Sequence, residues 1–210
     1  MKIAVLGSTG QIGSRIAYEA HRRGHIVTGI SRGAIAAEPA PPFTSTTADL
    51  FDEPALGRAV SGHDAIVNAY RGPPEGSPTV ADAAPYLIRV ARDTGVKRLI
   101  FIGGAGALEV SAGVRLADTD GFPDRLQSLA KAHQDVMDLL SETSDLDWTV
   151  FSPPAQIGPE SRSSRFRVGR RLMVDSAGNS RISYEDFAVA VVDELERREH
   201  VQQVVSAAYL

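Results

Sequence analysis

Three glycines near the start of the chain form the clearest chemical motif in the sequence. In "MKIAVLGSTGQIG", Gly7, Gly10 and Gly13 follow a short apolar run and precede a segment with helical spacing. A strand, a tight turn and a helix start together make an anion site, because unpaired backbone N–H groups and the helix dipole favour a phosphate. The motif therefore predicts a dinucleotide-binding loop, with hydroxyl donors from Ser8 and Thr9.

The three glycines have separate expected tasks. Gly7 allows the turn, Gly10 lets a pyrophosphate approach the backbone, and Gly13 lets the helix pack closely against the strand. The alternative is that the glycines only end a strand and pack a helix. The neighbouring residues that complete the predicted contact with the cofactor are Gln11 and Ile12.

The end of the second predicted strand indicates which dinucleotide binds. An acidic residue about 20 positions past the loop holds a free ribose 2′-hydroxyl, whereas an arginine suits a 2′-phosphate. This chain has Ser31 and Arg32 there and no acid before Glu38. We therefore expect NADPH to be preferred over NADH; a solvated surface arginine is the alternative. Asp49, with Leu50 beside it at the end of the third strand, is expected to bind the adenine edge.

Alternating strand-like and helix-like segments must position these residues. This alternation predicts an α/β fold of the Rossmann type, a doubly wound and mostly parallel sheet with helices on both faces. Residues 1–210 are expected to form a single domain, in which about 155–182 make a small lobe on the substrate side. Strands are predicted within 2–7, 25–31, 44–50, 64–70, 96–104 and 146–154, and helices within 11–24, 52–62, 77–95, 123–143 and 183–199.

Composition excludes several other classes of function. The net charge of −4 argues against a nucleic-acid surface, and the basic stretch at 161–171 is read as a solvated loop. There is no cysteine, so thiolate catalysis and cysteine metal sites are excluded, and the five histidines show no ligand spacing. No signal-peptide pattern or long apolar run is present, so we expect a cytoplasmic monomer or homodimer that binds neither membrane nor metal.

A set of motifs spread over the whole chain resembles a known group of proteins. "GSTGQIG", "SRG", "IGGAGALEV", "LDWTVFSPP" and "GNSRISYEDFAVAVVDELE" together look like the atypical short-chain dehydrogenases/reductases. Within these, the chain is most similar to the NADH-flavin reductase-like or NmrA-like group, which is related to the flavin/biliverdin reductases. The glycine loop alone is common, whereas its combination with the two later motifs is more specific.

The resemblance implies a catalytic Tyr-x-x-x-Lys pair that this chain lacks. Lys131 lies in the matching helix, but Gln127 stands where the tyrosine would be, and glutamine does not titrate. None of the five tyrosines has a lysine four residues later. Reduction of a flavin can proceed without the pair, because the ring system spreads the added charge. In the flavin/biliverdin reductases a histidine occupies the matching helix, which makes His133, together with Lys131, a candidate catalytic residue; an idle surface side chain is the alternative for each.

The resemblance also implies contacts at the ends of other strands. Gly103, Gly104 and Ala105 are expected to let a nicotinamide and a planar substrate approach the backbone. Pro153, with Pro154, matches a proline turn beside the nicotinamide amide. Arg181 and Ser183 lie in the motif "SRIS", although a helix N-cap explains Ser183 equally well. The residues expected to line the cofactor ribose are Asn68, Ala69 and Tyr70.

Two functions remain from different classes. The first is an NAD(P)H-dependent oxidoreductase that reduces a free flavin or a similar planar acceptor. The second is a non-catalytic, NmrA-like sensor that binds NADP(H) and reports its redox state to a partner. An epimerase using bound NAD(P) is weaker, because no base stands at the expected position.

Overall fold

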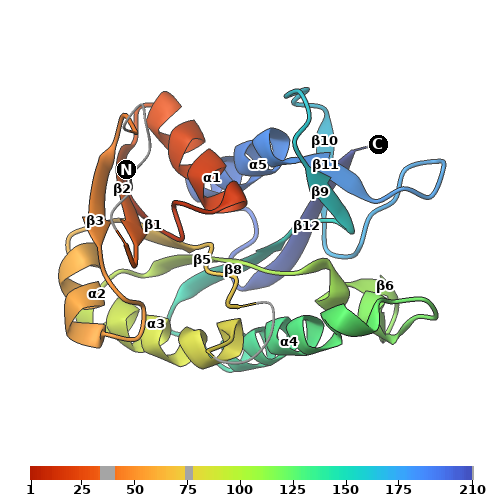
Figure 1. Cartoon of the computed structure of the whole chain (residues 1–210), viewed down its shortest axis with the longest axis horizontal. Helices are drawn as coiled ribbons and strands as arrows, with labels where there is room; N and C mark the ends of the chain where they lie inside the picture. The colour runs from red at the N-terminus through yellow and green to blue at the C-terminus, as the bar shows by residue number, and fades with distance from the viewer. Residues whose placement is uncertain (34–40, 74–77, 210) are drawn as a thin grey trace.

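An eight-stranded sheet forms the centre of the molecule (Figure 1). The computed structural model describes residues 1–33, 41–73 and 78–209. The strand order is β10-β12-β8-β5-β4-β1-β2-β3, and every neighbouring pair is parallel except β10 with β12. The strands are β1 (Lys2–Leu6), β2 (Ile26–Ser31), β3 (Thr44–Thr47), β4 (Ala65–Asn68), β5 (Arg98–Ile102), β8 (Asp147–Ser152), β10 (Phe166–Gly169) and β12 (Gln203–Tyr209).

The sheet is wound in two directions from β1, as the sequence predicts. The chain proceeds from β1 to β2 and β3 on one side, then returns to β4, β5, β8 and β12 on the other. Such a reversal leaves a crevice outside the carboxyl ends of the strands, where ligands bind in open α/β sheets. The predicted α/β Rossmann-type fold is therefore confirmed.

Helices cover both faces of the sheet in two layers (Figure 1). One layer packs apolar residues such as Ile16 and Phe187 against one face, and the other packs Leu56, Leu87 and Leu140 against the opposite face. Because both faces are covered, the central strands β1, β4 and β5 are buried along nearly their whole length. The first layer contains α1 (Gln11–Arg22) and α5 (Tyr184–Arg197); the second contains α2 (Glu53–Val60), α3 (Val80–Thr94) and α4 (Gln127–Ser141).

Helix starts follow local sequence signals. Asp52 caps α2 by accepting from the Ala55 N–H at 3.0 Å, and Ser183 caps α5 by accepting from the Asp186 N–H at 3.0 Å. Helix α3 begins at Val80, three residues later than the predicted segment, and contains Pro85 in its interior. Thr79 and Asp82 form a reciprocal capping box at that start.

Two short sheets lie outside the central one. The long connection after β5 forms a hairpin of β6 (Glu109–Ser111) and β7 (Val114–Arg115), which the sequence did not predict. The region around 155–182 contributes β9 (Gln156–Gly158), which pairs with β11 (Arg181–Ser183). This region also supplies β10 to the central sheet, so it is not wholly a separate lobe.

Candidate functional site

The glycine turn between β1 and α1 has the geometry that its sequence predicts. Gly7 has a φ of +74°, and a Cβ there would lie 2.8 Å from the Ala69 carbonyl oxygen. A Cβ on Gly13 would overlap the Gly7 carbonyl group. The first and third glycines therefore allow β1, β4 and α1 to approach one another more closely than any other residue would permit.

The start of α1 presents unpaired backbone donors. Gly10 is the N-cap residue, it has no side chain to cap the helix, and the first turn contains no acidic residue. The first backbone N–H of α1 that donates to the Gly10 carbonyl is that of Ser14, at 3.0 Å. The N–H groups of the preceding residues in α1 therefore remain available for an anion.

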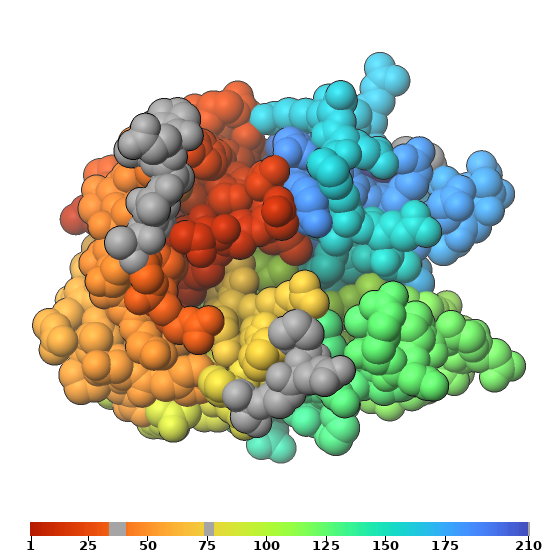
Figure 2. Space-filling view, viewed as in Figure 1, coloured from red at the N-terminus to blue at the C-terminus, as the bar shows by residue number. Residues whose placement is uncertain are grey.

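A cleft of about 390 Å³ opens beside this turn, at the crevice between β1 and β4. Figure 2 shows this face of the molecule hollowed where the red N-terminal segment meets the yellow segment that follows β4. Nine of the predicted cofactor residues line the cleft: Gly7, Thr9, Gly10, Ser31, Arg32, Asp49, Leu50, Ala69 and Tyr70.

Polar groups at one end of the cleft are held by the protein in different ways. The Ser31 hydroxyl donates to the Gly33 carbonyl at 2.6 Å. Asp49 accepts from the Phe51 N–H at 3.0 Å through one carboxylate oxygen. Arg32 is exposed, and within the described part of the chain it forms no ion pair. Glu38, the next acid in the sequence, lies outside the described residues. The cleft therefore offers a free guanidinium beside a partly engaged carboxylate.

The end of β4 forms another wall of the cleft. Asn68 is buried, and its side-chain oxygen accepts from the Tyr70 N–H at 3.2 Å. The Tyr70 hydroxyl donates to the Pro78 carbonyl at 2.8 Å. Burial, with a smaller contribution from Asp49, raises the pKa of Tyr70. The buried Asn68 side chain thus holds the backbone of the turn after β4 through this hydrogen bond. The raised pKa keeps the Tyr70 hydroxyl neutral.

A second cavity, of about 460 Å³, lies between the turn after β5 and helix α4. Gly104 and Ala105 line one side, and Leu129, Ala130 and His133 of α4 line another. The remaining lining residues come mainly from the loop 116–126: Leu116, Thr119, Asp120, Gly121, Phe122, Pro123, Arg125 and Leu126, with Gly106 and Ala155. Its interior is thus largely apolar.

His133 is the buried polar group of this second cavity. Its exposed fraction is 6%, and no described residue forms a hydrogen bond with its ring. Burial, together with the nearby positive charge of Arg71, lowers the pKa of His133 to about 4. Arg71 itself lines the first cleft, so the two spaces are near enough for a residue of one to affect a residue of the other.

The glycines after β5 make room for side chains. A Cβ on Gly104 would lie 2.6 Å from Cδ2 and 3.1 Å from Nε2 of His133. A Cβ on Gly103 would overlap the Ser152 hydroxyl, and one on Gly106 would lie 2.6 Å from the Ala130 Cβ. The observed reason for these small residues is therefore contact with the protein itself, a reason that the sequence did not reveal.

Lys131 is not brought to either space. Its side chain is 76% exposed and its ammonium pairs with Asp135 at 2.8 Å. Residues 131 and 133 are two positions apart on a helix, and such residues do not share a face. The catalytic role of Lys131 stays a prediction that its exposed position does not favour, whereas His133 lines the cavity.

Other predicted residues support the turns without lining a cavity. The Ser8 hydroxyl lies 3.4 Å from the Ile30 carbonyl, toward β2, and its role as a phosphate donor stays a prediction. Arg181 pairs with Glu160 at 3.2 Å. The predicted cofactor residues that line neither cavity are Ser8, Gln11, Ile12, Gly13, Asn68, Gly103 and Pro153.

Sequence reasoning missed several residues of these spaces. Phe51 packs edge-on against Tyr70 and Tyr86, with ring centroids 6.2 and 5.3 Å away. Both Phe51 and Arg71 directly follow predicted strand-end residues, so their position after β3 and β4 was the available signal. Phe122 and Arg125 follow no strand or motif, and only the folded loop brings them to α4.

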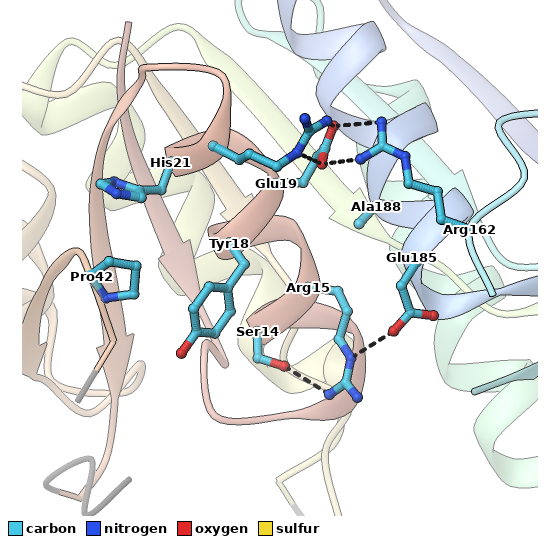
Figure 3. A pocket seen from close by; sticks show the side chains of 10 residues that line it. Ser14, Arg15, Tyr18, Glu19, His21, Pro42, Arg162, Glu185 and Ala188 are labelled. Atoms are coloured by element: carbon cyan, nitrogen blue, oxygen red, sulfur yellow. Dashed lines mark hydrogen bonds and ion pairs between the residues drawn. The ribbon is translucent and has the colours of Figure 1, made fainter. Parts of the chain in front are cut away.

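A third cavity, of about 530 Å³, lies between α1 and α5 (Figure 3). The three arginines that line it form ion pairs with neighbouring carboxylates: Arg22 and Arg162 pair with Glu19, and Arg15 pairs with Glu185. These pairs connect α1 to the C-terminal part of the chain. The cavity is thus better explained as a structural groove than as a ligand site.

Neither metal nor membrane features stand out in the ranges described. Residues 1–33, 41–73 and 78–209 contain no group of three histidine or acidic side chains arranged to hold a metal ion. Among the helices of the same ranges, none combines the length and apolar character needed to cross a lipid bilayer.

Comparisons with known proteins agree with this geometry. Residues 7–198 match the model of a family described as NAD(P)H-binding. A crystal structure of a candidate exported protein from Burkholderia pseudomallei is 49% identical, covers 100% of both chains and has a TM-score of 0.92. A candidate epimerase from Bacteroides thetaiotaomicron is 31% identical, with 100% of this chain and 97% of that chain covered and a TM-score of 0.90. A candidate NADH-flavin reductase from Streptococcus pneumoniae is 29% identical over 100% of both chains, with a TM-score of 0.86.

Proposed function

The chain belongs to the NAD(P)H-binding family, and from this premise we propose that it is an NADPH-dependent oxidoreductase that reduces a planar, conjugated acceptor such as a free flavin. The observation that carries the proposal is the pair of neighbouring spaces. One is a cleft at the glycine turn, and the other is a largely apolar cavity with an unpartnered histidine.

The first cleft fits a phosphorylated dinucleotide. Gly7 and Gly10 leave the backbone bare at the turn, and the α1 N-terminus supplies donors for a pyrophosphate. Asp49 retains one carboxylate oxygen for the adenine edge. Arg32 would bind a 2′-phosphate in a charge-assisted, two-pronged contact, which is the basis for preferring NADPH over NADH.

The second cavity is suited to hold the acceptor. When bound, the dinucleotide supplies a hydride, and the protein must hold the acceptor against it while excluding water. The apolar side chains Leu129 and Phe122 would contact the faces and edges of a planar ring. His133 would contribute a hydrogen bond from a neutral imidazole, because its lowered pKa keeps it uncharged near neutral pH.

This arrangement does not require a tyrosine acid. Tyr70 is neutral and its hydroxyl is engaged with Pro78, while Gln127 donates to the Ala117 carbonyl at 2.9 Å. A flavin or quinone can delocalise the charge it gains and take its proton from solvent. The chain therefore fits reduction of such an acceptor better than oxidation of a simple alcohol.

Steady-state oxidation of NADPH tests the proposal. We expect the absorbance of NADPH to fall when FMN, riboflavin or a quinone is added, and more slowly when NADH replaces NADPH. Glycine-turn variants provide the matched control for cofactor binding. No turnover with any of these acceptors, despite tight NADPH binding, would refute the enzymatic function.

A redox sensor of the NmrA-like kind is the second candidate, favoured by the absence of a tyrosine acid. It would bind NADP⁺ and NADPH with different affinities, consume neither, and capture a protein partner. Calorimetric titration with both nucleotides distinguishes this function from the first.

Location and assembly stay predictions. We propose a cytoplasmic monomer or homodimer; because one similar structure is named as exported, fractionation of the source cells is the direct test of location.

A further inference from the structure

The two charged side chains that line the second cavity are exposed to solvent. Arg125 and Asp120 both line the cavity and are both exposed, whereas His133 is buried among Gly104, Ala105 and α4. A planar ring that reaches His133 would therefore leave any substituent near the loop 120–125. The charges of that loop decide which substituent is favoured.

Arg125 is available to a ligand. Within the described ranges its guanidinium pairs with no carboxylate, whereas Arg115 of the same long connection holds Asp118 through two contacts, at 2.8 and 3.1 Å. The Asp120 carboxylate, which also lines the cavity, is not within ion-pair distance of Arg125. The Arg125 guanidinium therefore forms no ion pair with Asp120, the acidic residue that lines the same cavity.

Two other features add positive potential. The turn Asp124–Leu126 leads directly into α4, whose N-terminus has no side-chain cap. Arg71 is close enough to lower the pKa of His133. Among the described lining residues Arg125 is the one cation and Asp120 the one acid, so their formal charges balance. Asp124, next to Arg125 in the sequence, does not line the cavity.

His133 supplies an independent indication that a ligand belongs here. It is more than nine-tenths buried, lines the cavity, and has no hydrogen-bond partner among the described residues. A bound ring carbonyl or ring nitrogen would supply the hydrogen-bond partner that no described residue supplies to this imidazole.

We propose that the acceptor is anionic: its planar ring lies against Gly104 and Ala105 with a hydrogen bond to His133, and its phosphate or carboxylate tail is bound by Arg125. This inference rests on the proposed function, since it assigns a substrate class to the same cavity. A phosphate monoester carries between one and two negative charges near neutral pH and accepts two parallel N–H bonds from a guanidinium.

FMN and riboflavin form the test pair, because they share one ring system and differ by a terminal phosphate. We expect kcat/KM with NADPH to be about tenfold higher for FMN than for riboflavin, a difference that shrinks as ionic strength rises. Arg125→Gln should lower the value for FMN about tenfold and leave that for riboflavin nearly unchanged. Arg58→Gln removes an exposed positive charge on α2, away from the cavity, and should change neither value.

A naphthoquinone with and without a carboxylate tail identifies the source of the anion. If Arg125→Gln lowers turnover only of the tailed quinone and not of FMN, the tail is a carboxylate; if it lowers only that of FMN, the tail is a phosphate. Equal effects on charged and neutral acceptors, or no effect on any of them, would overturn the inference.

Binding measured without turnover separates this inference from the proposed function. Quenching of flavin fluorescence during titration gives the affinity for FMN and riboflavin in the presence of NADP⁺. Affinity that depends on Arg125 without NADPH oxidation would refute the reductase and keep the anion site. Equal reduction of both flavins by wild-type and Arg125→Gln protein would refute the anion site and keep the reductase.

Discussion

At the scale of single residues, burial determines what His133 can do. A histidine on a helix surface titrates near neutral pH, but the ring of His133 lies among Gly104, Ala105 and apolar residues of α4. Removal from water disfavours the charged imidazolium, and Arg71 disfavours it further, so the pKa falls to about 4. His133 is thus a fixed hydrogen-bonding group rather than a proton donor at neutral pH.

The lowered pKa predicts a pH dependence of stability. Between about pH 6.5 and 4 the unfolded chain binds a proton at residue 133 that the folded chain does not, so acidification favours unfolding. The free energy of unfolding should therefore fall with decreasing pH in this window, with a contribution of up to about 1.4 kcal/mol per pH unit from this group. Above the window the contribution should be constant.

Urea unfolding of the wild type and His133→Asn at several pH values measures this contribution. The difference in unfolding free energy between the two proteins should change across the window and stay level above it. A difference that is independent of pH from neutrality to pH 4 would contradict the neutral, buried imidazole.

Arg32 predicts the choice of cofactor at the same scale. A charge-assisted contact with a 2′-phosphate is worth about 2–3 kcal/mol, so Arg32→Glu should weaken NADPH binding at least about tenfold and leave NADH binding nearly unchanged. Isothermal titration with both nucleotides measures this, with Arg58→Glu as a control for net charge. Equal loss of both affinities would contradict the assignment of Arg32 to the 2′-phosphate.

At the scale of elements, the close packing of α1 against the turn after β1 depends on Gly13, which has no side chain. Gly13 lies in the first turn of α1, and a Cβ at this position would overlap the Gly7 carbonyl. The helix would have to move away from the turn, and its N-terminal donors would move with it. Packing of α1 and the geometry of the anion site are therefore coupled through this contact.

Gly13→Ala should lower both stability and cofactor affinity. Overpacking of a close contact costs about 1–3 kcal/mol, although alanine is the better helix former. Gly57→Ala in α2 is the matched control: the nearest atom to its new Cβ is Thr94 Cγ2 at 3.9 Å, so it should stabilise the protein by about 0.5–1 kcal/mol. Thermal unfolding and NADPH titration of both variants provide the measurement; a stabilised Gly13→Ala protein would contradict the tight contact.

At the scale of the whole molecule, a buried ion pair connects the amino end of β5 to α5. Arg98 donates to Glu194 at 2.7 Å, with both side chains 3% exposed, and Glu194 also accepts from His200 Nδ1 at 2.7 Å. Thr149 of β8 joins the same group through a 2.8 Å bond from Arg98. The network lies near the amino ends of the strands, whereas the two cavities lie beyond their carboxyl ends.

Glu194→Ala should destabilise the fold without altering the site. It leaves the buried Arg98 guanidinium without a counter-ion, which costs about 3–5 kcal/mol. Asp145→Ala breaks the exposed pair with Arg92, with side chains 47% and 45% exposed, and should have little effect. Denaturant unfolding measures both, and the NADPH affinity of the folded protein should be unchanged; a similar, small loss in both variants would contradict the importance of burial.

The sequence alone determined the features that depend on short-range chemistry. The glycine turn, the alternation of strands and helices, and the cap at Ser183 follow from backbone freedom, apolar spacing and local hydrogen bonds, and the structure contains all three. The doubly wound, mostly parallel sheet also follows, because right-handed crossovers leave few arrangements for such an alternation, whereas the order of its strands was not predicted. Nine of the 18 residues predicted to bind the cofactor consequently line one cleft.

Only the tertiary structure decided the features that depend on contacts between distant segments. Asp186 is an example: it lies in the first turn of α5, and its carboxylate accepts from the N–H groups of Ser163 and Ser164 and from the Tyr209 hydroxyl. The exposure of Lys131, the burial of His133 against Gly104 and the approach of Arg125 to α4 likewise depend on how a long connection folds over a helix. Local spacing cannot encode such contacts, because their partners are separated in sequence and are selected by packing.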